Sequence, residues 1–392
     1  MSDALTASGT VHWIGTGLST GSGLRVLIDQ APRVLVWGRT IERAERCLAR
    51  VRRPGRASTR AYDLPALAEE LRPGDVVVSM LPAAEHAKLL GVCVDQRAHF
   101  ACSSYLSEPI QAEGPAAEAA GLVVLTEAGL DPGIDHLFAD LLVAGARAAV
   151  GDVRATARFT SYCGGIPSAP NEFRYQFSWA PRGVLTALLA PARYIEDGAV
   201  RVVDRPWEAT RPHVLDGAAF EVYPNRDSIP YLTQYAVPHL WRFDTFMRGT
   251  LRLDGWQRAW AGVFAELRTG TSERIAALAD ELAARYPTTD ADRDRVILAV
   301  ALTVSAADGR TWSGEYLLDA TGDAAETAMA RCVSLPLSFG VGEILAGRTP
   351  PGVRQAAQGA ELAQRWLDAL GRHGVTCRFR DSGEPAGTAV GH

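Results

Sequence analysis

The chain has 392 residues, which is enough for two domains of roughly 100–200 residues each. Hydrophobic residues make up 47% and charged residues 22%, as in ordinary globular proteins. The net charge of −5 argues against a protein that binds nucleic acid or an anionic membrane mainly by electrostatics. No apolar run approaches the ~20 residues of a membrane-spanning helix.

Six scattered cysteines form no C-x-x-C pair and no zinc-like Cys/His spacing, and the N-terminus lacks the basic and apolar regions of a secretory signal. We therefore expect a reduced, cytoplasmic protein without structural disulfides and without a metal site. Lys88 is the single lysine, so arginine is the default cation of this chain. This bias weakens any argument that a given arginine is functional.

The first third of the chain alternates strands and helices. Apolar runs at 11–14, 33–37, 58–62, 75–81, 98–103 and 122–126 predict strands, separated by helix-length segments such as 24–30 and 40–53. This alternation predicts an α/β fold with a Rossmann-like, doubly wound parallel sheet.

A glycine-rich segment, 15–23, follows the first predicted strand. Glycines there allow a tight turn and a close approach to a pyrophosphate, and the next helix offers free N–H groups at its N-terminus. The spacing is G-x-G-x-x-x-G rather than G-x-G-x-x-G, and a plain flexible loop is the alternative. In its position after a first strand, the segment favours a dinucleotide site.

The end of the second strand distinguishes between cofactors. NAD-binding folds place an acidic residue there for the ribose hydroxyls, but residues 36–40 contain none. Arg39 can instead bind a 2′-phosphate, with Thr40 as a second donor. We therefore favour NADP and keep NAD, and a merely solvated Arg39, as alternatives. The fourth strand ends in Ser79-Met80-Leu81-Pro82, which is typical of a strand that passes the nicotinamide ribose.

From about residue 130 the regular alternation stops. Extended stretches at 153–163, 175–179, 199–204, 218–223 and 246–253 suit a mixed sheet, and helices are predicted at 255–267 and 272–286. Strands at 294–306 and 311–319 follow, joined by a turn. Two further helices are predicted at 321–332 and 336–345, and we expect the tail, 381–392, to be disordered.

Residues 130–136 read LDPGIDH, and this run resembles the signature of the saccharopine reductase family, the NADP-dependent, L-glutamate-forming saccharopine dehydrogenases. Other segments agree with that family in the same order: 38–40, 103–105, 161–167, 177–179, 182–184, 223–228, 248–252 and 328–336. The resemblance therefore spans nearly the whole chain.

The resemblance implies a discontinuous dinucleotide-binding domain, 1–130 and 325–380, and an inserted α+β substrate domain, 131–324, built on a mixed sheet. It implies that L-glutamate and 2-aminoadipate 6-semialdehyde condense to an imine that NADPH reduces to saccharopine. A small amino-acid substrate and a homodimer fit this picture. The alternatives are a dehydrogenase of another amino-acid–aldehyde adduct, of the carboxynorspermidine or homospermidine type, and a non-catalytic NADP-binding sensor.

Saccharopine carries three carboxylates, so its site needs cations and neutral donors. The resemblance places these residues at the substrate: Ser104, Tyr105, Asp131, Arg226, Thr250, Leu251 and Arg252. Arg182 and Arg248 stay open between a substrate contact and a solvated charge. The glycine-rich segment and the end of the second strand indicate these cofactor contacts: Gly15, Gly17, Leu18, Ser19, Gly38, Arg39 and Thr40. The resemblance adds Leu130 and Pro132. We also expect Asp63, Leu81, Ser103 and Trp179 at the cofactor, with a core position as the alternative for Trp179.

Reduction of an imine also needs a protonated nitrogen, and Asp131, Tyr105 and Cys163 are the candidates for proton transfer. Each has a structural alternative: a helix N-cap for Asp131, a core side chain for Tyr105 and a buried thiol for Cys163. We expect Asp135 and His136 to stabilise the motif. Ala180 stands where the family has a serine, so one cofactor hydrogen bond is expected to be missing.

Overall fold

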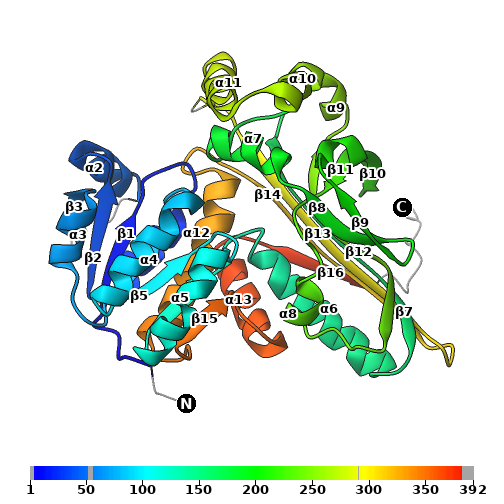
Figure 1. The fold of residues 1–392 in the computed structure, drawn as a ribbon, viewed down its shortest axis with the longest axis horizontal. Helices are drawn as coiled ribbons and strands as arrows, with labels where there is room; N and C mark the ends of the chain where they lie inside the picture. The colour runs from blue at the N-terminus through cyan, green and yellow to red at the C-terminus, as the bar shows by residue number, and fades with distance from the viewer. Residues whose placement is uncertain (1–3, 52–55, 290, 382–392) are drawn as a thin grey trace, which may run out of the picture. The chain divides into compact units, whose positions relative to one another are not determined.

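The computed structural model describes residues 4–51, 56–289 and 291–381, which divide into two compact units. Unit 1 comprises the described parts of Met1–Ile134, with Ser178–Ala180 and Gly322–Ala357. Unit 2 comprises Asp135–Phe177, the described part of Pro181–Thr321, and the chain from Gln358. Figure 1 shows the elements of both units.

The C-terminal division differs from the expected return of 325–380 to the first domain. Gly322–Ala357 belong to unit 1, but the described part of Gln358–His392 belongs to unit 2. The reason is strand pairing, because β16 (Cys377–Asp381) pairs with β14 (Thr311–Thr321) of unit 2. Asp381 thus ends a strand, and the rest of the predicted disordered tail, 382–392, lies outside the described residues.

Unit 1 contains a parallel sheet in the order β3-β2-β1-β4-β5-β6-β15. Its strands are β1 (Thr10–Ile14), β2 (Arg33–Gly38), β3 (Ala57–Ala61), β4 (Val76–Ser79), β5 (His99–Cys102), β6 (Val123–Thr126) and β15 (Gly352–Gln355). This order confirms the predicted doubly wound sheet and places its switch point between β1 and β4, where the carboxyl ends of the strands bind ligands in such folds.

The helices of unit 1 follow their apolar stripes. They are α1 (Ser22–Gln30), α2 (Ile41–Arg50), α3 (Leu64–Glu70), η1 (Ala83–Glu85), α4 (His86–Asp95), α5 (Glu108–Ala119) and α12 (Ala328–Leu345). In α2, for example, Ala44 and Cys47 are buried at helical spacing, and Thr40 accepts a hydrogen bond from the Arg43 N–H as the N-cap.

Helix α12 corrects the expectation of two helices at 321–332 and 336–345. It is continuous through the buried Pro336, while residue 321 still belongs to β14. Tight packing against α1 offsets the local cost of proline: a Cβ on Gly23 would lie 1.9 Å from the Ser334 carbonyl oxygen. By length and composition α12 passes as a membrane span, but 67% of it is buried, as in a core helix.

Unit 2 is built on a mixed sheet in the order β10-β11-β12-β7-β13-β14-β16, with β8 and β9 at its side. Its further strands are β7 (Ala155–Pro167), β8 (Ala192–Glu196), β9 (Ala199–Val203), β10 (Arg211–Leu215), β11 (Ala218–Pro224), β12 (Trp241–Leu253) and β13 (Asp294–Ala306). The central pair, β12 and β7, is parallel, and β13 is antiparallel to β7. The inserted domain on a mixed sheet is as predicted.

The helices of unit 2 lie around this sheet (Figure 1). They are α6 (Ile134–Val150), α7 (Pro181–Leu189), η2 (Pro206–Ala209), α8 (Tyr231–Gln234), α9 (Trp256–Ala259), α10 (Ala261–Thr269), α11 (Ser272–Arg285) and α13 (Ala360–Arg372). α6 packs on one face of the sheet, where Phe138 stacks on Tyr316 of β14.

The expected strand at 175–179 is absent from the structure. Asn171 holds this segment in a turn, because its side chain bonds both the N–H and the carbonyl of Tyr175. Tyr175 and Phe177 then pack their rings into a cluster with Phe173 and Trp260. Side-chain hydrogen bonds and aromatic packing therefore replace the sheet ladder here.

Candidate functional site

The loop after β1 divides its glycines between two tasks. Gly15 has a φ of +110°, and a Cβ there would lie 3.0 Å from the carbonyl of Met80, so the turn beside the end of β4 requires glycine. Gly17 faces open space: apart from its two chain neighbours, no described residue has an atom within 4 Å of the point that a Cβ on it would occupy. Gly17, with Leu18 and Ser19, is therefore the part of the loop whose backbone a phosphate can approach.

The first turn of α1 corrects one expectation. Its N–H groups are not free for a phosphate: Ser22 N–H donates to Glu326 at 2.8 Å, and Gly23 N–H donates to the Ser334 hydroxyl at 3.0 Å. Glu326 also accepts a hydrogen bond from Arg331 at 2.9 Å. Gly21 and Gly23 thus allow α1 to pack closely against α12 and the segment before it. The N–H groups available to a phosphate belong to the loop before α1.

Gly38 ends β2, and Arg39 and Thr40 lie between β2 and α2. A Cβ on Gly38 would lie 2.7 Å from the Ala44 nitrogen, so this close turn needs glycine. Arg39 is exposed, and its side chain has no ion pair with any residue that the structure describes. Thr40 accepts the hydrogen bond of an N-cap, and its side chain also hydrogen-bonds the Glu42 carboxylate, which lowers the pKa of Glu42.

The other predicted cofactor residues lie at several places in unit 1. Asp63 caps α3 by accepting the Ala66 N–H at 3.2 Å, and Leu81 packs partly buried against the core of the unit. Ser103 follows β5, and a Cβ on Gly129 would lie 2.8 Å from its side chain. Leu130 and Pro132 are buried in the next turn, and Trp179 lies in the 178–180 segment.

Residues 129–134 form a tight turn before α6. Gly129 N–H donates to the Pro132 carbonyl, and Ile134 N–H donates back to the Gly129 carbonyl, both at 2.9 Å. Because α6 begins at Ile134, Asp131 precedes the helix by three residues and is not its N-cap. Its carboxylate instead accepts a hydrogen bond from the Tyr105 hydroxyl at 2.8 Å. Two of the three proton-transfer candidates thus lie together.

The loop that carries Ser104 and Tyr105 is held by Glu127, a buried residue with a φ of +58°. Glu127 N–H donates to the Ser104 carbonyl at 2.9 Å, and its carboxylate accepts the Leu106 N–H at 3.0 Å. Gln355 donates to the other carboxylate oxygen at 3.2 Å. These bonds fix the loop on both sides of the two predicted substrate residues.

In unit 2, strand register gathers three predicted residues on one face of the sheet. Thr250 of β12 lies opposite Cys163 of β7 and Tyr223 of β11, and Arg252 is two residues further along β12. Side chains alternate between faces, so these four share a face. Leu251 points to the other face, where it is fully buried in the core. Its backbone oxygen, rather than its side chain, is the group near Arg252.

Arg252 is only 6% exposed, and its surroundings are aromatic. The guanidinium carbon lies 4.9 Å from the ring centre of Tyr175, 5.5 Å from that of Trp256 and 5.7 Å from that of Tyr223. Its terminal nitrogens donate to the Tyr223 hydroxyl and to the Leu251 carbonyl, and its buried Nε has no partner among the described residues. No carboxylate in that part of the chain pairs with it.

Arg248 lies four residues earlier on the same strand and face, and its state is the opposite. It binds Asp135 with Nη2 at 2.6 Å and Nε at 3.2 Å, and its guanidinium covers the Tyr231 ring at 4.0 Å. Both partners of this ion pair are buried. Arg248 is therefore structural, and Asp135 stabilises the motif by this pair, as His136 does by its 2.9 Å bond to Tyr235.

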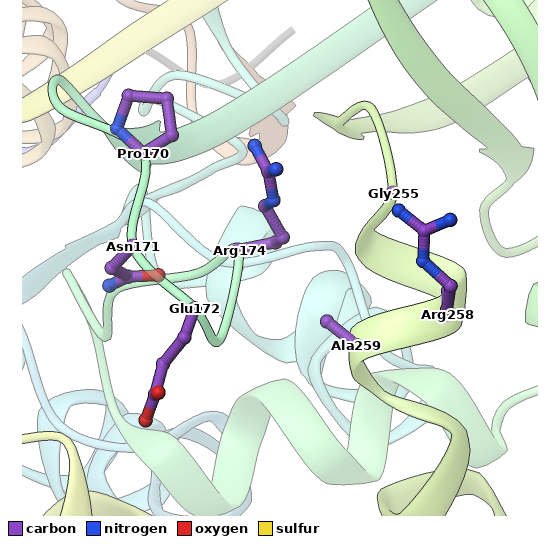
Figure 2. A pocket seen from close by; sticks show the side chains of 7 residues that line it. All are labelled: Pro170, Asn171, Glu172, Arg174, Gly255, Arg258 and Ala259. Carbon is purple, nitrogen blue, oxygen red and sulfur yellow. The ribbon is translucent and has the colours of Figure 1, made fainter.

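The remaining arginines are less enclosed. Arg226 follows β11 with a φ of +56° and is partly buried, and Arg182 is exposed on α7. A pocket of about 420 Å³ lies beside Gly255, and Figure 2 shows the guanidinium groups of Arg174 and Arg258 on its two sides. Arg174 and Gly255 directly precede Tyr175 and Trp256, two of the rings around Arg252.

Sequence reasoning missed the residues that hold the predicted ones in place. Nothing in the sequence distinguishes Tyr175 and Trp256 from other aromatic residues. Nor does it distinguish Glu127 and Glu326 from the other acidic residues. No spacing signal marks them, because each contact is made by residues distant in sequence. No group of three or more potential metal ligands gathers within the described ranges.

Two family models match the chain. One, described as the saccharopine dehydrogenase C-terminal domain, matches residues 129–375, and one described as the saccharopine dehydrogenase NADP binding domain matches residues 11–125. The saccharopine dehydrogenase (NADP(+), L-glutamate-forming) of Pyricularia oryzae is 38% identical over 255 residues, 64% of this chain and 55% of that protein. The match thus spans about half of that relative's length.

Solved structures give the same picture of the fold. The apo saccharopine dehydrogenase (L-Glu forming) from Saccharomyces cerevisiae has a TM-score of 0.78 at 25% identity and covers 95% of this chain and 99% of its own. A homospermidine synthase from Legionella pneumophila, solved with NAD, has a TM-score of 0.60 at 10% identity, with 100% of this chain and 95% of its own covered. The second likeness shows the fold alone.

Proposed function

We propose a function from one premise, that this chain belongs to the saccharopine dehydrogenase family. The proposal is that it interconverts saccharopine with L-glutamate and 2-aminoadipate 6-semialdehyde, with NADP(H) as the redox cofactor. The names of its relatives, which are NADP-dependent and L-glutamate-forming, support this choice.

The observation that carries the proposal is the buried Arg252, whose guanidinium pairs with no carboxylate of the described residues. A buried charge without a counter-ion is costly, and its enclosure by three rings compensates only part of that cost. An incoming carboxylate that pairs bidentately with the guanidinium supplies the missing counter-charge. Arg252 therefore fits a substrate that carries carboxylates, and it opposes a substrate that presents only ammonium groups, such as a polyamine.

In unit 1 the residues fit a bound dinucleotide. The open backbone at Gly17, with Leu18 and Ser19, would hold the pyrophosphate, and Arg39 with Thr40 would hold a 2′-phosphate. The absence of a carboxylate at 36–40 favours NADP over NAD. When bound, NADPH supplies the hydride that reduces the C=N bond of the substrate.

The chain's own residues bind, orient and balance charge. The amine of glutamate and the aldehyde lose water to form an imine, whose carbon accepts the hydride and whose nitrogen ends with a proton. Asp131, hydrogen-bonded by Tyr105, offers the negative charge that stabilises a protonated imine nitrogen. Ser104, Thr250, Leu251 and Arg226 complete the proposed set of substrate contacts, and Cys163 stays a candidate for proton transfer.

Consumption of NADPH, followed by its absorbance, tests the proposal. We expect turnover with glutamate plus the semialdehyde, and NADP reduction with saccharopine in the reverse direction. Putrescine in place of glutamate is the control for a homospermidine-type activity. Faster turnover with putrescine would overturn the substrate, and tight NADPH binding without turnover of any amine–aldehyde pair would point to the non-catalytic alternative.

A further inference from the structure

A buried hydrogen-bonded chain links the ends of two strands in unit 1. Ser79 is the last residue of β4, His86 is the first of α4, and Ser104 follows β5. The Ser79 hydroxyl lies 3.0 Å from Nδ1 of His86, and Nε2 of the same ring lies 2.8 Å from the Ser104 hydroxyl. Ser79 and His86 are each 1% exposed.

The His86 imidazole is neutral at physiological pH, because burial lowers the pKa of His86 to about 4. A neutral ring has one N–H donor and one nitrogen acceptor, so the two serines receive different hydrogen bonds. Which serine accepts depends on the nitrogen that carries the proton.

The surroundings of Ser79 decide the tautomer. Within the part of the chain that the structure describes, its hydroxyl has no hydrogen-bond partner except Nδ1 of His86. If Nδ1 carried the proton, the buried Ser79 O–H would have no acceptor in the protein, which is unfavourable. If Ser79 donates to Nδ1, only a lone pair of its oxygen stays unused. The proton therefore lies on Nε2 and is donated to the Ser104 oxygen.

We propose that His86 is a positioning residue that, as the Nε2–H tautomer, turns the Ser104 hydroxyl into a hydrogen-bond donor toward a substrate carboxylate. With its oxygen already accepting from His86, Ser104 directs its own O–H away from the ring. The assignment of a carboxylate ligand rests on the proposed function, whereas the tautomer stands on the geometry of Ser79 and His86 alone.

The first experiment measures the tautomer and needs no activity. Protein labelled with ¹⁵N-histidine is studied by NMR, in which a protonated ring nitrogen resonates far from an unprotonated one. His99 is an internal reference, since the Val123 N–H donates to its Nδ1 and its Nε2 lies 3.0 Å from the Leu5 carbonyl. We expect His86 also to show an unprotonated Nδ1 and a protonated Nε2. The His86 resonances are identified as those that disappear from the spectrum of the His86→Gln variant. A proton on Nδ1 of His86 would overturn the proposal.

The second experiment measures substrate binding with three variants and a cycle. His86→Leu removes the donor, and we expect the KM for saccharopine to rise about tenfold with kcat nearly unchanged. His86→Gln keeps an N–H near the Nε2 position and should restore KM to within about threefold. In a Ser104→Ala background, His86→Leu should have no further effect, because the histidine acts through that hydroxyl.

The control is His99→Leu, which removes another buried imidazole of the same unit. If His86 has a merely structural role, His86→Leu and His99→Leu should both lower thermal stability and leave KM unchanged. The effects of His86→Leu and Ser104→Ala should then be additive in the double variant. That outcome overturns the proposal. If the wild type shows no turnover, saccharopine binding by calorimetry replaces KM, and an NMR result for the Nε2–H tautomer then separates failure of the proposed function from failure of the tautomer.

Discussion

Replacement of Arg252 by methionine should separate ligand binding from folding. Arg252 is 6% exposed and its guanidinium has no carboxylate partner among the described residues, so methionine of similar length removes a charge that the ligand-free fold does not neutralise. Loss of one partner from a buried, hydrogen-bonded charge pair costs about 2–5 kcal/mol of binding free energy. At about 1.4 kcal/mol per factor of ten, kcat/KM for saccharopine should fall roughly 30- to 4,000-fold.

The stability of the same variant should change little. Methionine loses the cation–π contacts, each worth about 0.5–2 kcal/mol, but it also removes the cost of a buried charge with an unpartnered Nε. We expect the free energy of unfolding in denaturant to stay within about 1 kcal/mol of the wild type.

Two arginines of the same strand are matched controls. Arg248→Met removes the arginine that pairs with the buried carboxylate of Asp135 and should lower the free energy of unfolding by about 3–5 kcal/mol. Arg242→Met, on an exposed position of β12, should change neither stability nor kcat/KM. The reasoning is refuted if Arg252→Met keeps the wild-type kcat/KM, or if it unfolds as easily as Arg248→Met.

Three further predictions concern unit 1 and α6. Arg39→Ala should weaken NADP by about 10- to 100-fold and NAD by much less, with Arg43→Ala as the control; equal losses for both cofactors in cofactor-binding titrations would remove Arg39 as the phosphate ligand. Gly17→Ala should weaken NADPH binding at unchanged thermal stability, whereas Gly23→Ala should destabilise the fold by about 1–3 kcal/mol or more because of its 1.9 Å approach to Ser334. Burial raises the pKa of Asp140 to about 6 from 3.8, so its contribution to stability is present below pH 4 and is lost as pH rises through 6. Asp140→Asn should therefore stabilise the protein at pH 8 by up to about 3 kcal/mol and have no such effect at pH 4, as measured by urea unfolding at both pH values.

The strands of unit 1 were predictable because local signals suffice for them. Each is a short buried apolar run bounded by turns, and the β-α alternation admits few topologies. The failures have one cause, contacts between distant residues. Pro336 suggested a helix break, but packing against α1 keeps α12 continuous. Residues 175–179 were predicted as a strand, but their aromatic side chains pack into a cluster instead.

For the candidate site as well, local sequence signals identify residues but not the contacts between them. Motifs indicated Tyr105, Asp131 and Arg252 as residues, but not which of them would touch. Spacing also left Arg248 ambiguous, and only the pairing with Asp135 across 113 residues shows that it is structural. In an arginine-rich chain, the informative property of an arginine is the presence or absence of a carboxylate partner once it is buried. That property exists only in three dimensions.

Glu326, whose carboxylate lies against the first residue of α1, affects how a cofactor phosphate can be bound. Glu326 is held between the Ser22 N–H and Arg331, so it places a carboxylate at the end of α1 whose partial positive charge favours anions. A pyrophosphate near this end gains little from the helix and must be bound by the N–H groups of residues 16–19. The unusual glycine spacing follows, since Gly21 leaves room for the Glu326 carboxylate, 2.5 Å from where its Cβ would lie. With the helix end neutralised, we expect Arg39 to carry a larger share of the phosphate affinity than in a fold whose helix N-terminus is open.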